Sequence, residues 1–307
     1  MARSKRIKET AAGVAYYHVI SRTNNKVFLF ESAKTKDALV NALIRSATFS
    51  GVEIEAYAIM SNHIHAVVKV TRPECAALLM GSVPSLTETI PEAELLRRVE
   101  ILKGQKARQE LEMEWRELRK AGFDVRLGQE QNRLRVRMND VSEFVKTFKE
   151  TFDRIYKKNH EYCGSIWSGR FTSTLIEDGE YLARCRKYVF YNPIRAGLVS
   201  RAAEYRWSYD RSLIECGENL SLACETDDFE ASQMGSVPNG WWMRRVAQIG
   251  AGKVFGSAAF VMRKASGLGH LFPAKRVVAR PVGEIGFATH GWKLAKADVA
   301  RRVREVA

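Results

Sequence analysis

The sequence predicts an α+β fold with a ferredoxin-like antiparallel sheet, and two observations carry this prediction. Within about the first 80 residues, β-branched and aromatic stretches alternate with helical periodicity in the order strand, helix, strand, strand, helix. This order opens a split βαβ sheet. A fourth strand must follow later in the chain, and residues 170–176, RFTSTLI, are the best candidate.

Start and stop signals mark the opening elements. Ser32 is placed as an N-cap before a run of helical periodicity, and Gly51 follows its end. Ser61 and Asn62 predict a tight turn between two strands. The predicted elements are, in order, strand 14–23, helix 31–50, strands 52–60 and 64–70, and helix 73–80.

A charged segment separates this opening from the fourth strand. Residues 91–121 are dense in Glu, Arg, Lys and Leu and predict a long solvated helix, interrupted at Gly104. Residues 141–156 predict another helix with one aromatic face. We therefore expect residues 84–140 to form a helical insertion into the sheet domain. A structural role is favoured for it over that of an arm that grips DNA.

Composition indicates a folded protein with a polyanionic partner. The chain of 307 residues is 46% hydrophobic and 27% charged, which argues against wholesale disorder. Its net charge is +14 and its pI about 9.6. Nucleic acid and anionic membrane both suit such a charge. The sequence has neither an amphipathic basic anchor nor a lipidation signal, so nucleic acid is favoured.

The charge changes sign along the second half of the chain. Residues 201–240 carry a net charge of −5, whereas residues 241–307 carry +10. This shift divides the chain into a sheet domain at 1–212, an acidic linker at 213–240 and a basic extension at 241–307. We expect glycine-punctuated helices in the extension, which is a candidate DNA-binding region.

The five cysteines are scattered and include no CxxC pair, which argues against a disulfide framework and a zinc ribbon. No secretory signal and no apolar run of 18 or more residues is found. These observations favour the cytoplasm and no membrane association.

The sharpest motif is Asn62-His63-Ile64-His65 at the start of the third strand. Side chains alternate along a strand, so His63 and His65 project from one face and could chelate one divalent ion. An isolated pair of this kind is more often two polar strand residues.

The second motif is YVFYNPIRAGLV at 188–199, on a helix predicted over 178–191 and stopped by Pro193. Tyr188 and Asn192 are four residues apart and share a helix face. A tyrosine with a pKa near 10 needs a nearby cation to act as a nucleophile. A core tyrosine is the alternative, and Asn192 precedes proline, which favours the helix end for it.

Together these segments resemble the IS200/IS605-like single-tyrosine transposases of the HUH type, in particular the REP-associated tyrosine transposases. The resemblance covers about residues 10–212 without the insertion. It rests on five segments, namely YYHVISR at 16–22, AYAIMSNHIHAVV at 56–68, WSGRF at 167–171, YVFYNPIRAGLV at 188–199 and YRWSYDRS at 205–212.

The resemblance implies a metal-dependent transposase that nicks and rejoins single-stranded or hairpin DNA. Mg²⁺ or Mn²⁺ would be held by His63, His65 and Asn192. Tyr188 would attack a phosphodiester to form a 5′-phosphotyrosine link and release a 3′-OH. The neighbouring Tyr191 competes for this role. The resemblance favours Tyr188, because the nucleophile of the family lies four residues before the Asn-Pro pair. Relatives include dimers and monomers, so a homodimer is one of two assemblies it allows.

Four further residues are candidates for DNA contact: His18, Arg22, Arg170 and Arg195. His18 and Arg22 alternate onto one face of the first strand, where strand packing is an equal alternative. Trp167 and Phe171 could stack on bases, although core packing is favoured.

Two other functions remain open. The first is a DNA- or RNA-binding regulator that keeps the fold without catalysis. The second is a metal-dependent hydrolase that activates water at the two histidines and forms no link to the protein.

Overall fold

The protein is described by a computed structural model covering residues 13–72, 90–212, 252–257, 260, 264, 277–282 and 285–290. The sheet domain contains, in chain order, β1 (Gly13–Arg22), α1 (Ala33–Ser50), β2 (Val52–Ile59), β3 (His63–Arg72), α5 (Val141–His160), β4 (Thr172–Ile176), α6 (Glu180–Phe190), α7 (Asn192–Arg195) and β5 (Ser208–Asp210). The elements from β1 to α6 follow the predicted order, whereas α7 and β5 were not predicted. The predicted helix at 73–80 lies outside the described residues.

The sheet has the strand order β5-β2-β3-β1-β4-β6-β8-β7. Its first five strands are antiparallel, with β1 between β3 and β4. β2, β3, β1 and β4 give the ferredoxin-like order that the strand-helix-strand-strand opening predicts. The fold class predicted from the sequence is therefore confirmed.

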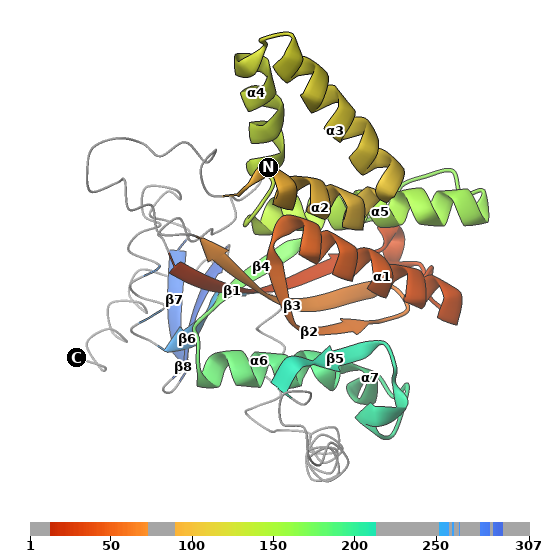
Figure 1. Ribbon diagram of the computed structural model, residues 1–307. Helices are drawn as coiled ribbons and strands as arrows, with labels where there is room; N and C mark the ends of the chain where they lie inside the picture. Colours follow the sequence, from red (N-terminus) through yellow and green to blue (C-terminus); the bar gives the residue numbers. More distant parts are fainter. Residues whose placement is uncertain are drawn as a thin grey trace.

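The helices cover the sheet on both sides (Figure 1). α1 and α5 pack together on one face, where Phe30, Phe144 and Phe152 are among the fully buried side chains. Trp167 and Phe171 belong to this core, as the packing interpretation expected. α6 covers the opposite face through Leu182, Cys185 and Val189.

The ends of α1 confirm the predicted caps. The Ser32 hydroxyl accepts a hydrogen bond from the backbone N–H of Thr35 at 3.1 Å. Gly51 ends the helix in the left-handed region, with a φ of 64°. A side chain is unfavourable in that conformation, so glycine suits this position.

The insertion is helical, as expected, and contains α2 (Glu92–Lys103), α3 (Gln105–Lys120) and α4 (Asp124–Arg135). Gly104 interrupts the long predicted helix, as expected, with a φ of 95°. The three helices have a core of their own around Leu95, Trp115 and Leu127. α3 and α4 project away from the sheet (Figure 1).

The basic extension differs from the prediction. Its described residues include three strands, β6 (Gly252–Ser257), β7 (Val277–Val282) and β8 (Ile285–His290), where helices were expected. β6 runs parallel to β4 and extends the same sheet, and Val254 is fully buried in the core shared with α1 and α5. The β-branched residues Val277, Val278 and Val282 favour a strand, which the sequence prediction overlooked.

Among the helices that the structure describes, none combines the length and the apolarity needed to span a bilayer.

Candidate active site on the α6 face

The histidine pair begins β3, and both side chains project toward α6. The ring centroids of His63 and His65 lie 4.9 Å apart. The Nδ1 atom of His63 is 2.7 Å from Oδ1 of Asn62, a contact that orients the imidazole and directs its Nε2 elsewhere. The strand alternation thus brings both imidazoles to one face, as the spacing predicts.

A third histidine joins the pair from the neighbouring strand β1. Nε2 of His18 lies 2.9 Å from Nδ1 of His65, and the two rings are nearly parallel. His18 is only 1% exposed, so it faces the histidine pair rather than solvent. The expectation that His18 contacts DNA directly is therefore not supported, because a phosphate would have to displace this packing to reach the ring.

All three imidazoles are held neutral by their surroundings. Burial lowers the pKa of His18 to about 3. Burial, with a smaller contribution from the positive charge of Arg22, lowers the pKa of His63 to about 4. The pKa of His65 is also well below its usual value, mainly through burial and then through His18. A neutral imidazole is the form that binds a metal ion.

Tyr188 lies against this cluster. Its ring centroid is 5.8 Å from those of His18 and His65, and both contacts are edge-on. The guanidinium of Arg195 lies over the same ring, 4.8 Å from its centroid. α6 thus brings the second sequence motif directly onto the first.

Tyr191, the competing tyrosine, packs elsewhere. It is 7% exposed and forms a separate cluster with Phe190, Ala202 and Ile194. The ring of Tyr188, by comparison, contacts both His18 and His65.

Asn192 follows the end of α6, as the proline after it predicted, and begins the short helix α7. Its Nδ2 donates to the backbone carbonyls of Tyr188 at 2.9 Å and Val189 at 3.4 Å. These bonds fix the amide orientation, so Oδ1 is the atom that could serve as a ligand.

The donor chemistry of His63, His65 and Asn192 fits a divalent ion that takes its remaining ligands from substrate. Two neutral imidazoles and an amide oxygen leave several positions of an octahedral shell open, as Mg²⁺ and Mn²⁺ require in phosphoryl chemistry. Within the described ranges, no cluster of three or more His, Cys, Asp or Glu side chains suits a metal ion. A site here therefore depends on the amide and on substrate oxygens.

Basic side chains line the same region. Arg22 pairs in register with His63, so the two side chains share a face of the sheet, and Arg22 is exposed. The backbone carbonyl of Arg22 accepts a hydrogen bond from Ser168 at 2.9 Å, which brings the WSGRF segment alongside. Arg170, two residues further on, is exposed. Of the four predicted DNA contacts, Arg22 lies opposite His63 and Arg195 lies over Tyr188, while Arg170 is exposed in the segment that follows the contact of Ser168 with Arg22.

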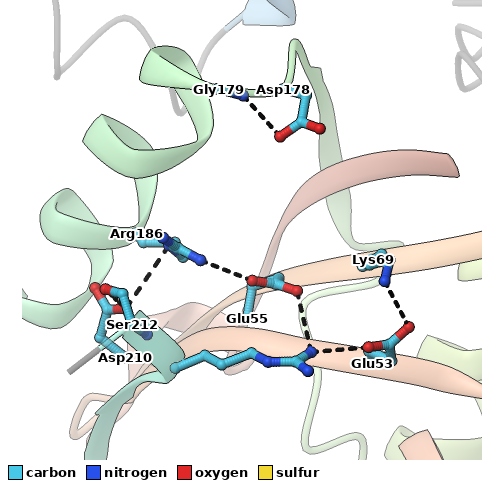
Figure 2. A network of polar contacts seen from close by, with 9 residues as sticks. Glu53, Glu55, Lys69, Asp178, Gly179, Arg186, Asp210 and Ser212 are labelled. Atoms are coloured by element: carbon cyan, nitrogen blue, oxygen red, sulfur yellow. Dashed lines mark hydrogen bonds and ion pairs between the residues drawn. The ribbon is translucent and has the colours of Figure 1, made fainter. Parts of the chain in front are cut away.

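A network of buried charges holds α6 to the sheet (Figure 2). Arg186 lies 2.9 Å from Oε2 of Glu55 on β2 and 3.7 Å from Oδ1 of Asp210 on β5. Arg211 contacts Glu53 at 2.8 Å and Glu55 at 3.4 Å. Glu55 and Asp210 are 5% and 3% exposed, so the two pairs that Arg186 makes are less screened than surface ion pairs.

A β-bulge makes this network possible. The pairing of β2 with β3 shifts register between Ile54 and Ala56, which leaves Glu55 as the extra residue. Val52 and Tyr57 belong to the α1 and α5 core, whereas Ala56 packs under α6. Because of the bulge, the side chains of the consecutive residues Glu55 and Ala56 both face α6. Neither the bulge nor the network was predicted from the sequence.

The fold and the assembled side chains define a class: an antiparallel ferredoxin-like sheet with two histidines on one strand and a tyrosine helix laid over them. Residues 12–90 match the family described as "Transposase IS200 like". This segment, which contains His18, His63 and His65, is thus similar to IS200-like transposases, in agreement with the resemblance seen in the sequence.

Two solved structures are similar to the chain. One is described as a REP-associated tyrosine transposase bound to a REP hairpin; its TM-score is 0.39 at 14% identity, covering 67% of this chain and 82% of that one. The other is a putative transposase from Deinococcus radiodurans R1, with a TM-score of 0.28 at 13% identity, covering 60% of this chain and 95% of that one. A search of curated proteins finds no match.

Proposed function

We propose that the protein is a metal-dependent transposase that nicks single-stranded or hairpin DNA and transfers the cut strand through a 5′-phosphotyrosine intermediate. The observation that carries this proposal is the packing of the Tyr188 ring against His18 and His65, at 5.8 Å from each. A tyrosine beside neutral imidazoles, in a basic protein with a transposase family match, suits phosphodiester chemistry better than core packing alone.

His63, His65 and Asn192 would hold Mg²⁺ or Mn²⁺. When bound, such an ion polarises the scissile phosphate and favours the phenolate form of a nearby tyrosine. His18 keeps His65 in place through its hydrogen bond, which is the usual arrangement behind a ligating histidine. Asn62 does the same for His63.

The phenolic oxygen of Tyr188 would attack the phosphorus atom. A Tyr188 O–P bond forms, the P–O3′ bond breaks, the phenolic proton is released, and the leaving 3′ oxygen takes up a proton. The reverse reaction, with a 3′-OH as nucleophile, rejoins strands without ATP because the phosphoester bond energy is retained. Arg22, Arg170 and Arg195 would hold phosphates of the substrate strand.

The proposal places the protein in the cytoplasm, with DNA as its partner. A homodimer and a monomer both remain compatible with it. The basic residues of 241–307 would add contacts to a folded substrate such as a hairpin.

The decisive test is a denaturing gel of protein incubated with 5′- or 3′-labelled hairpin DNA from the flanks of its own gene, with Mn²⁺ or Mg²⁺. We expect the fragment on the 3′ side of the cut to migrate with the wild-type protein. Tyr188→Phe should lower adduct formation on the order of 10³-fold or more, because the nucleophile is lost. Tyr191→Phe is the matched control and should retain the adduct.

Each alternative gives a different gel. Equal cleavage by wild type and Tyr188→Phe with no adduct would indicate a hydrolase that activates water. No cleavage and no adduct, together with a shift of this DNA by the wild type in a native gel, would indicate a regulator that binds and does not cut. An adduct that is kept by Tyr188→Phe and lost by Tyr191→Phe would show that Tyr191 is the nucleophile.

A further inference from the structure

The loop between β1 and α1 presents two apolar side chains to solvent. Val27 is 51% exposed and Phe28 is 61% exposed. Their neighbour Phe30 is fully buried against Phe152 and Trp167, so the loop inserts one aromatic ring into the core and leaves another outside. Isolated exposed apolar residues are common, so the position of this pair decides its meaning.

The loop is held firmly on both sides. Asn24 N–H donates to the carbonyl of Ile166 at 2.8 Å, and Phe30 N–H donates to that of Ser61 at 2.9 Å. The Thr23 hydroxyl donates to the carbonyl of Val27 at 2.8 Å. Asn25 and Lys26 adopt positive φ values of 51° and 57°, which only a well-supported turn maintains in residues other than glycine. The exposure of Phe28 is thus a property of an ordered loop.

This loop adjoins the histidine site directly. Nδ2 of Asn62 donates to the carbonyl of Lys26 at 3.1 Å, while Oδ1 of the same side chain lies 2.7 Å from Nδ1 of His63. One amide side chain therefore links the loop to a proposed metal ligand. Arg22, in register with His63, precedes the loop, and Lys26 within it is exposed.

We propose that Phe28, flanked by Val27, is a stacking platform for an unpaired base of the substrate strand, next to the phosphate that is cut. This inference rests on the proposed function and names how that site would recognise single-stranded DNA. Single-stranded nucleic acid is bound by aromatic rings that stack on bases beside cations that hold the backbone. Phe28 supplies the ring, and Arg22 and Lys26 supply the cations. A base inside a duplex offers no free face, so the platform would favour unpaired nucleotides.

The chain contains a matched comparison residue. Phe123, between α3 and α4 in the insertion, is 56% exposed and has an exposed valine two residues away, Val125. It has the same side chain and a similar exposure, but it lies on the helices that project from the sheet (Figure 1). Any effect of general surface hydrophobicity should be equal at the two phenylalanines.

The test measures binding of a fluorescent hairpin with a single-stranded extension by anisotropy, in full-length Tyr188→Phe protein so that no cleavage intervenes. Phe28→Ala should weaken binding about 5- to 50-fold, the range typical of one lost base stack. Phe28→Trp should bind within about threefold of the parent, because indole also stacks. Phe123→Ala should bind like the parent. Thermal melting of each variant checks that the fold is retained.

Photocrosslinking locates the contact independently of affinity. 5-Iodo-deoxyuridine is placed at successive positions around the cleavage site, and crosslinked peptides are identified by mass spectrometry. We expect one position to crosslink at Phe28. Unchanged affinity of Phe28→Ala, with crosslinks confined to other residues, would overturn the inference, as would a change in oligomeric state of Phe28→Ala without a change in DNA binding.

The outcomes separate this inference from the proposed function. If wild type forms the Tyr188 adduct while Phe28→Ala binds normally, the platform is wrong and the nuclease stands. If Phe28 crosslinks to DNA while wild type forms no adduct, the platform stands and the catalytic proposal fails.

Discussion

The two faces of the central sheet are built on different principles. The face under α1 and α5 is a continuous apolar layer, in which the rings of Phe30, Phe152 and Trp167 contact one another. The face under α6 has a smaller apolar cluster, which includes Val67, Leu182 and Cys185. Buried histidines lie toward β1 and β3, and buried ion pairs lie toward β2 and β5.

The difference indicates that one face of the sheet mainly stabilises the fold, whereas the other carries the polar groups of the candidate site. The apolar face holds the domain together through apolar area removed from water. The α6 face keeps polar groups at low exposure, which costs free energy unless each group finds a partner or a ligand. Such a cost is typical of a face that serves a reaction.

The largest expected effect comes from removing the proposed ligands on the α6 face. His63→Ala or His65→Ala should weaken Mn²⁺ binding about 100-fold or more, since the donor set retains only one imidazole. Isothermal titration with Mn²⁺ measures this without reference to activity. His160→Ala, which removes a histidine stacked on Tyr156, is the control and should bind like wild type. Equal Mn²⁺ affinity in all variants would remove the metal from the proposal.

The next effect concerns the ion pairs on the other flank of α6. Arg186→Met should lower the single-turnover cleavage rate about 10- to 100-fold while Mn²⁺ affinity stays within about threefold, because the helix that carries Tyr188 loses its charged contacts. Lysine at this position should restore part of the rate, since it keeps the charge.

Arg184→Met is the matched control for this variant. Arg184 lies on the same helix and pairs with Glu180, which is largely exposed. Its loss should change the rate less than about threefold. If the two variants slow cleavage equally, the buried network does not position the nucleophile.

The smallest expected effect is a dependence of stability on pH. The pKa values of His18, about 3, and of His63, about 4, lie below those of the unfolded chain, near 6.5. Between these values the unfolded state binds more protons, so the free energy of unfolding falls as the pH drops below about 6.5. At pH 5 each of these two histidines should lower the free energy of unfolding by ~1–2 kcal/mol relative to pH 7.5.

Urea unfolding at pH 7.5 and pH 5 measures this loss. His18→Gln should show a smaller loss between the two pH values than wild type, whatever its stability at pH 7.5. His160→Gln should keep the wild-type dependence. An identical loss in all three proteins would mean that the α6 face does not bury its histidines in the neutral form.

The sequence predicted correctly those features that depend on neighbouring residues alone, such as helix ends and the alternation of side chains along a strand. Ser32, Gly51 and Gly104 act at the ends of single helices, and the alternation at His63 and His65 follows from strand geometry alone. Asn192 was placed at a helix end because proline follows it, as the structure shows.

What the sequence did not predict depends on residues that are far apart in the chain. Arg186 meets Glu55 across 131 positions, and His18 meets His65 across 47. The hydrogen bond of His18 could not be read from β1 alone, so the residue was assigned to DNA. α4, β5 and the strands of the extension were also missed. β5 has only three residues, and pairing partners rather than local periodicity define β6 and β8.

The parallel pairing of β6 with β4 also matters for self-association. An uncovered strand offers a row of unpaired N–H and C=O groups to any other extended chain. A protein shortened to residue 212 would leave β4 as an uncovered edge strand. It would also lack Val254, which is buried in the core. The extension therefore covers the β4 edge and moves the edge of the sheet to β7.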